Sequence, residues 1–235
     1  MSVAVDGPAA RIVVALDVDE LDQAVALARR LSGRVGWLKV GLELFTREGP
    51  RAVAAIAEHA PVFLDLKLHD IPTTVARSVA SVARLDAGLL TVHASGGPTM
   101  LRAAADAAGE ASDGRLRLLA VTVLTSTSDD ELAAMGSESA EVQVPRLAAM
   151  AIASGIDGLV CAPVDLGRVR AAVGADALVV TPGIRAQAAD SDDHVRAMSA
   201  SAAVSAGADL LVIGRPITRA DDPVAAVEAI VATLA

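Results

Sequence analysis

Short apolar runs recur along the whole chain, and each is followed by an Ala-rich segment with helical spacing. Nearly continuous apolar strands that alternate with helices indicate a parallel sheet covered by helices. Eight such runs occur in 235 residues, which favours a single-domain α/β fold, a closed (β/α)8 TIM barrel, over an open doubly wound sheet. The predicted strands are residues 11–18, 36–41, 62–68, 89–95, 117–124, 158–163, 178–184 and 210–217.

The segments between these runs are predicted to be the helices of the barrel. No GxGxxG dinucleotide fingerprint follows the first predicted strand. We see no linker or second domain, so we expect an N-terminal tail, residues 1–10, and one catalytic barrel over residues 11–235. Ser128 and Glu131 have the spacing of a helix capping box. The predicted helical segments include residues 47–59, 74–84, 98–108, 142–154, 196–206 and 223–234.

Polar side chains collect near the C-terminal ends of the predicted strands, where TIM barrels carry their active sites. In "DLKLHDIP" (65–72), two carboxylates and an ammonium follow an apolar strand, although buried charges are costly unless paired. A strand directs residues i and i+2 to one face, so we expect Asp65 and Lys67 to be neighbours. Polar groups that converge from seven strands predict an active site rather than one structural ion pair. The others are Asp17, Lys39, His93, Ser95, Thr125, Arg185 and Arg215.

These motifs resemble those of the orotidine 5′-phosphate decarboxylase family, which carries out the last step of UMP biosynthesis. "DLKLHDIPTT" (65–74), with Lys39 upstream, is followed in the expected order by "TPGIR" (181–185) and "VIGRPIT" (212–218). The Asp-x-Lys-x-x-Asp element alone is shared with sugar-phosphate decarboxylases and synthases of the same superfamily. The Ile-Pro-x-Thr and "TPGIR" elements point to the pyrimidine enzyme.

The resemblance implies a charged catalytic array, with Lys67 as the proton donor to C6 and no metal or cofactor. It also implies a homodimer with shared active sites, because Asp70 and Thr74 match residues that reach into the neighbouring subunit's site. The array would consist of Lys39, Asp65, Lys67 and Asp70. The substrate contacts would be Asp17 and Lys39 at the ribose, Thr125 at the pyrimidine, and Arg185, Gly214 and Arg215 at the phosphate.

Two positions depart from the family pattern. Thr73 stands where the family usually has Asn. Residues 185–196 resemble the mobile loop that closes over the phosphate, and the Gln that usually bridges phosphate and pyrimidine falls on His194. A neutral imidazole both donates and accepts a hydrogen bond, so His194 is predicted to take over this contact, with Gln187 as the alternative.

Physical chemistry supports the same assignment. Loss of CO2 from C6 of orotate leaves a carbanion that the ring delocalises poorly, so catalysis needs a positioned charge and a proton donor. Two other functions stay open from the residues. A magnesium-dependent 3-keto-gulonate-phosphate decarboxylase or hexulose-phosphate synthase would share Asp65, Lys67 and Asp70. A silent barrel that binds a phosphorylated ligand would have no need of the array.

The composition of the chain argues against some classes of binding partner. A net charge of −9 and 1% aromatic residues argue against nucleic-acid binding. No apolar run approaches the roughly 18 residues of a membrane span. The single cysteine, Cys161, lies in an apolar run and is expected in the core. With no secretory signal recognisable at the start of the sequence, we expect a cytoplasmic protein that binds a small-molecule substrate.

Overall fold

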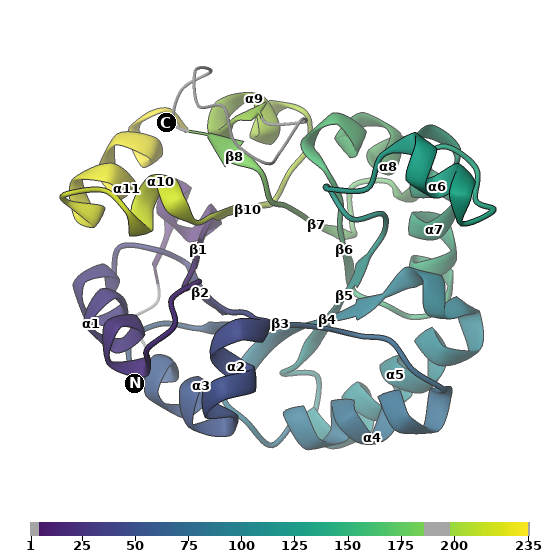
Figure 1. Cartoon of the computed structure of the whole chain (residues 1–235), viewed down its shortest axis with the longest axis horizontal. Coiled ribbons are helices and arrows are strands. Elements are labelled where there is room, and N and C mark those ends of the chain that lie inside the picture. Colours follow the sequence, from purple (N-terminus) through teal and green to yellow (C-terminus); the bar gives the residue numbers. More distant parts are fainter. Residues whose placement is uncertain (1–4, 186–197, 235) are drawn as a thin grey trace.

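The computed structural model describes residues 5–185 and 198–234. Within these ranges, eight parallel strands close into a barrel that helices surround, which confirms the predicted fold (Figure 1). Strands β8 (Ile184–Arg185) and β9 (Met198–Ser199) pair separately beside the barrel. The barrel strands are β1 (Ile12–Ala15), β2 (Trp37–Val40), β3 (Val62–Leu68), β4 (Ala87–His93), β5 (Arg117–Val121), β6 (Gly158–Val160), β7 (Leu178–Thr181) and β10 (Leu210–Ile213).

The helices follow the strands, with two differences from the prediction. In the predicted helical segment 196–206, Met198 and Ser199 form β9, and the helix spans only Ala200–Ser205. The segment 47–59 is not one helix, because the chain breaks at Gly49, whose φ of +60° favours glycine, and restarts at Pro50. The described α-helices are α1 (Leu21–Leu31), α2 (Leu42–Glu48), α3 (Pro50–Ala57), α4 (Pro72–Val82), α5 (Gly97–Ser112), α6 (Asp129–Ala134), α7 (Ala140–Ala153), α8 (Leu166–Val173), α9 (Ala200–Ser205), α10 (Arg215–Thr218) and α11 (Pro223–Ala232). Short 3-10 turns lie at Gly7–Arg11, Ala94–Gly96 and Pro163–Asp165.

Apolar side chains form two separate cores, because successive residues of a strand point to opposite faces. The larger core lies between the strands and the helices, and it includes Cys161 as predicted. The smaller core fills the interior of the barrel and includes Phe63 and Leu89. The next residues that alternation directs inward on β3 and β4 are Asp65 and Thr91, so the interior changes from apolar to polar along the barrel axis.

Two further predictions concern local features. The capping box is confirmed, since the Ser128 hydroxyl accepts a hydrogen bond from the Glu131 backbone N–H and the Glu131 carboxylate accepts one from the Ser128 N–H. The described part of the chain contains no helix that is both long and apolar enough to span a membrane.

Candidate active site

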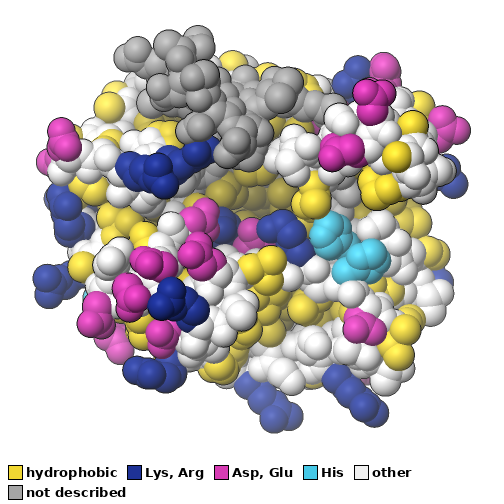
Figure 2. All heavy atoms as spheres, viewed as in Figure 1, with side chains coloured by type: hydrophobic (Ala, Val, Ile, Leu, Met, Phe, Trp, Pro, Cys, Tyr) yellow, Lys and Arg dark blue, Asp and Glu magenta, His cyan; other side chains and the backbone are white. Residues whose placement is uncertain are grey.

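A cavity of about 620 Å³ opens at the C-terminal ends of the barrel strands. Figure 2 shows the hollow at the centre of this face, with basic and acidic side chains inside it. Its lining brings together most of the site residues predicted from the sequence. These are Asp17, Lys39, Asp65, Lys67, Thr125, Gly214 and Arg215.

Four of these side chains form a chain of alternating charge. Lys39 Nζ lies 3.0 Å from Asp17 Oδ1 and 3.6 Å from Asp65 Oδ2. Lys67 Nζ donates to both oxygens of Asp65, each at 2.9 Å. The predicted contact between Asp65 and Lys67 is therefore present. The sequence of charges is minus, plus, minus, plus, and each charge has an opposite neighbour.

Strand register explains why Lys39 bridges the two carboxylates. Strand β2 lies between β1 and β3, and Lys39 is level with Ala15 on one side and Phe63 on the other. Asp17 and Asp65 each follow two residues after those partners, on the same inward face of the barrel. A lysine side chain is long enough to rise from its own level and reach both. Lys39 is only 7% exposed, so its charge is held inside the protein.

An irregularity in β3 places Lys67. Leu64 pairs with Leu90 and Leu68 pairs with Val92, so three residues of β3 lie opposite the single residue Thr91. Lys67 has a φ of +50°, a left-handed conformation that costs a residue other than glycine about 1 kcal/mol. Bulges of this kind re-aim side chains near active sites. Here the bulge turns the Lys67 ammonium back onto Asp65.

The charges around Asp65 keep it ionised. Burial by itself raises the pKa of this carboxyl, but Lys39 and Lys67 outweigh it, with added hydrogen bonds from Lys67 and Thr91. The net result is an Asp65 pKa below its ordinary value. The pKa of His93 is also lowered, first by burial and then by the neighbouring His69 and Lys67. The two imidazole rings are 5.4 Å apart.

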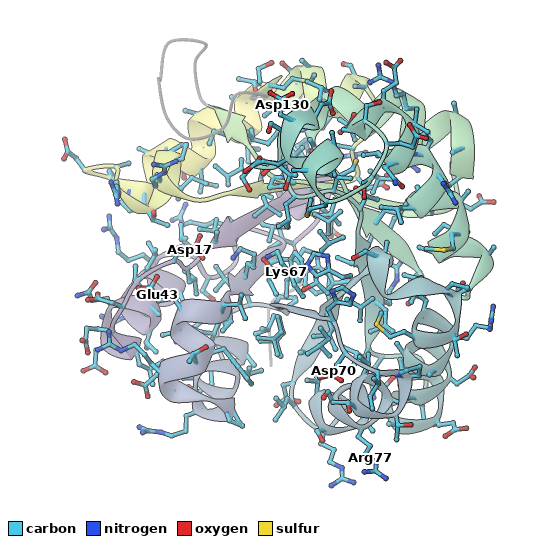
Figure 3. All side chains as sticks on the ribbon, turned by 45° about the vertical axis from the view of Figure 1, so that its right-hand side comes forward. Asp17, Glu43, Lys67, Asp70, Arg77 and Asp130 are labelled. Atoms are coloured by element: carbon cyan, nitrogen blue, oxygen red, sulfur yellow. The ribbon has the colours of Figure 1, made fainter. Side chains whose placement is uncertain are left out.

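Some predicted residues lie outside this cavity. Asp70 and Thr74 are exposed at the start of α4, and Figure 3 shows Asp70 well apart from Lys67. Asp70 Oδ1 accepts a hydrogen bond from the Ile71 N–H at 2.6 Å. The side chain of Arg185, and the whole of Gln187 and His194, lie outside the described part of the chain.

Two residues that lie against the array were not predicted from the sequence. Thr91 is fully buried and hydrogen-bonded to both Asp65 and Lys67. Thr91 could have been found from the sequence by strand alternation, because it lies two residues before His93 and therefore shares its face of the strand. Gly41 lies against the Lys39–Asp17 pair, and a Cβ there would come 3.0 Å from Lys39 Nζ and 3.1 Å from Asp17 Oδ1.

Comparison with known proteins finds one family whose members match nearly the whole chain. The model of the Orotidine 5′-phosphate decarboxylase / HUMPS family matches residues 10–230. Orotidine 5′-phosphate decarboxylase of Trichlorobacter lovleyi is 50% identical over 225 residues, covering 94% of this chain and 93% of the relative. The protein of the same name from Thermobifida fusca is 49% identical over 229 residues, covering 96% of both chains.

Solved structures agree with these relatives. The crystal structure of orotidine 5′-phosphate decarboxylase from Lactobacillus acidophilus matches with a TM-score of 0.83 and 38% identity, covering 95% of this chain and 98% of that one. An uncharacterized conserved protein from Geobacillus kaustophilus matches with a TM-score of 0.82 and 35% identity, over 95% of this chain and 100% of that one. The closed barrel, its charged mouth and these matches together show that the chain belongs to the orotidine 5′-phosphate decarboxylase / HUMPS family.

Proposed function

We propose that this protein is an orotidine 5′-phosphate decarboxylase, which converts orotidine 5′-phosphate to UMP in the last step of de novo pyrimidine biosynthesis. The observation that carries the proposal is the alternating array of Asp17, Lys39, Asp65 and Lys67 at the mouth of the barrel. Relatives of that name, about half identical to this chain over nearly its whole length, support it.

Lys67 is the proposed proton donor. When the bond between C6 and the carboxylate breaks, its electron pair stays on C6 and CO2 leaves as a neutral molecule. The Lys67 ammonium stabilises the developing negative charge and then gives a proton to C6, which yields UMP and a neutral amine. Solvent returns the proton to the amine. The reaction as proposed needs no metal and no cofactor.

Asp65 has two proposed effects on this step. Its negative charge pairs with the Lys67 ammonium and holds it in place in a partly buried site. It also faces the carboxylate of the bound substrate, and two unit charges 4 Å apart repel by about 4 kcal/mol at an effective dielectric constant of 20. This repulsion disappears as CO2 departs. We regard the first effect as the larger.

The remaining contacts orient the substrate. We propose that Asp17 and Lys39 hold the ribose hydroxyls and that Thr125 contacts the pyrimidine. The phosphate is assigned to the end of the cavity where Gly214 precedes α10 and Arg215 begins it. Loops after the seventh and eighth strands of TIM barrels often bind phosphate. Arg185 and His194 complete the proposed phosphate contacts.

We further propose that the protein is a homodimer with shared active sites and that it acts in the cytoplasm. Asp70 and Thr74 are exposed and do not line their own chain's cavity, as expected of residues that serve a partner's site. Ile71 between them is 67% exposed, which suits a surface covered by another subunit. A single cysteine suits a reducing compartment.

The test is to incubate the purified protein with orotidine 5′-phosphate, with and without EDTA, and to measure UMP by chromatography. Equal UMP formation under both conditions is expected. Activity that EDTA abolishes would contradict the metal-free mechanism, and no UMP formation under either condition would overturn the proposed substrate. Asp222→Ala, which removes an exposed ion-pair partner outside the cavity, serves as the active control variant.

A further inference from the structure

Thr91 contacts two residues of the array, and the proposed mechanism gives it no role. It lies on β4, its side chain points into the barrel, and it is fully buried. Its hydroxyl accepts a hydrogen bond from the Lys67 backbone N–H at 2.8 Å and donates one to Asp65 Oδ1 at 2.9 Å. One buried hydroxyl therefore connects the backbone of the proposed proton donor to the carboxylate that holds its ammonium.

The direction of these two hydrogen bonds is fixed by chemistry. A backbone N–H only donates, and a carboxylate only accepts. The single proton of Thr91 must therefore point at Asp65, while one of its lone pairs faces Lys67. No other arrangement satisfies all three groups, so the hydroxyl holds the Asp65 carboxylate in one orientation.

The hydrogen bond from the Lys67 N–H to the Thr91 hydroxyl is important because it lies at the bulge of β3. Three residues of β3 lie opposite Thr91, and the Lys67 N–H donates to the Thr91 side chain there. A buried N–H without a partner is strongly disfavoured. The Thr91 hydroxyl thus satisfies the backbone of Lys67 at the residue whose left-handed conformation aims the ammonium.

We propose, on the basis of the proposed function, that Thr91 is a positioning residue for the decarboxylation, which holds the left-handed backbone of Lys67 and the carboxylate of Asp65 in their reactive arrangement. It touches neither the substrate nor the reacting carbon in this account. It acts through its two hydrogen bonds, and its hydroxyl rather than its methyl group is the part that matters.

Two variants separate the hydroxyl from the methyl group. Thr91→Val keeps the shape and removes the hydroxyl, whereas Thr91→Ser keeps the hydroxyl and removes the methyl group. Thr122→Val is the matched control, since Thr122 is also buried and donates to the Val160 carbonyl at 3.0 Å, but lies outside the cavity lining. If Thr91→Val does not fold, Thr91→Ala removes the same hydroxyl with less bulk.

The kinetic readout is kcat, KM and their dependence on pH. Thr91→Val is expected to lower kcat about 10- to 100-fold with little change in KM, because binding contacts are intact but the charges are misplaced. The acid limb of the kcat profile should move to higher pH, since Asp65 loses one hydrogen bond to its ionised form. The other groups that face Asp65 are Lys39 on β2, Lys67 on β3 and His93 on β4. Thr91→Ser should restore both kcat and the profile.

A second readout does not depend on turnover. The chain contains only two lysines, Lys39 and Lys67, so protein labelled with heavy nitrogen in lysine alone gives two backbone amide signals. Lys67→Arg identifies which signal belongs to Lys67. In Thr91→Val the Lys67 amide should lose protection from hydrogen exchange while the Lys39 amide keeps it, and Thr91→Ser should restore protection. This result stands even if the wild-type protein does not act on orotidine 5′-phosphate.

Three results would overturn the proposal. One is wild-type kcat in Thr91→Val with an unchanged acid limb. Another is a Thr91→Ser variant as slow as Thr91→Val, because packing of the methyl group would then explain the loss. The third is unchanged protection of the Lys67 amide in Thr91→Val. An inactive wild type with the expected amide result would instead refute the proposed reaction and keep the structural role of Thr91.

Discussion

At the scale of single residues, the site depends on small distances around the charged array. The exposed fraction of the Asp65 side chain is 14%, and it accepts hydrogen bonds from Lys67 and Thr91 while Lys39 lies 3.6 Å away. Such a carboxylate binds its cations more strongly than it would in water. Its ionised form therefore stabilises the folded protein, and this contribution depends on pH.

Asp65→Asn tests this dependence. Because the pKa of Asp65 is lowered in the folded state, its stabilising contribution is present above its ordinary value of 3.8 and is lost as pH falls through the folded-state pKa. We expect Asp65→Asn to reduce the free energy of unfolding by about 3 kcal/mol at neutral pH, since Lys39 and Lys67 lose their shared anion. Urea unfolding of both proteins measures the difference. A difference that stays constant down to about pH 3 would contradict the account.

Gly41→Ala tests the other end of the array. A methyl group there would lie 3.0 Å from Lys39 Nζ and 3.1 Å from Asp17 Oδ1, so we expect the pair to separate and kcat/KM to fall about tenfold. The backbone itself tolerates alanine, because the φ of Gly41 is −91°. Gly109→Ala is the control: Gly109 lies in α5, a Cβ there would meet nothing within 4 Å, and the variant should keep full activity. Equal activity of the two variants would mean that the Lys39–Asp17 contact is dispensable.

Among the secondary-structure elements, the two ends of the barrel strands have different roles. The C-terminal ends carry the charged array, whereas aspartates just before β6 and β10 cap neighbouring strands at the opposite end. Asp157 accepts from the Leu118 N–H, and Asp209 accepts from the Val179 N–H and from Arg170, at 2.6 to 2.7 Å. In TIM barrels this N-terminal end serves stability rather than catalysis.

Asp209→Ala should therefore lower stability and leave the chemistry intact. Loss of charge-assisted hydrogen bonds is expected to cost about 2 kcal/mol, which corresponds to a Tm about 4–8 °C lower for a chain of this size. Calorimetry gives the Tm, and kcat measured well below it should equal that of the wild type. Glu228→Ala, which breaks an exposed ion pair with Arg34, is the control and should change stability by less than about 0.5 kcal/mol. A large loss of kcat in folded Asp209→Ala would mean that the two ends are coupled.

Strand positions were well predicted because barrel strands are buried on both faces. The range 62–68 matches β3 residue for residue, and the other predicted strands overlap the observed ones with ends that differ by a few residues. The final prediction, 210–217, ran too far, because β10 ends at Ile213 and Arg215 begins a helix. An apolar run continues through a strand and into a helix turn alike, so the pattern does not mark that boundary.

The charged residues of the cavity were also predicted, and the geometry that joins them was not. Asp65 and Lys67 were expected to meet because residues i and i+2 share a face. They do meet, yet through a bulge and a left-handed Lys67 that no pattern in the sequence indicates. Thr91 was missed because a threonine inside an apolar strand is ordinary, and its importance depends on which residues lie opposite it.

In the whole molecule, one chain holds only part of the catalytic set that the family resemblance implies, which consists of Lys39, Asp65, Lys67 and Asp70. Asp70 lies outside the cavity that contains Lys67. Leu42, at the start of α2, and Ile71, just before α4, are 53% and 67% exposed. A dimer that covers this rim and brings Asp70 to the partner's cavity would complete this set.

Complementation between two inactive variants tests this arrangement. When Lys67→Ala and Asp70→Ala subunits are mixed and allowed to exchange, each heterodimer should contain one site with both Lys67 and Asp70 and one site with neither. Up to about half of the wild-type activity per heterodimer is expected, since half of the sites are complete. Mixtures that exchange subunits and show no activity would refute the shared site. Each variant mixed with itself is the control.

The role of Lys67 as proton donor is tested most directly by UMP formation from orotidine 5′-phosphate by Lys67→Ala under single-turnover conditions. We expect a loss of at least about 10²- to 10⁴-fold, because both the proton donor and the charge near C6 are removed, while circular dichroism shows an intact fold. Lys67→Arg, which keeps the charge but not an acid of suitable strength, should remain severely impaired. If Lys67→Ala kept more than a tenth of the wild-type rate, Lys67 would not be the proton donor.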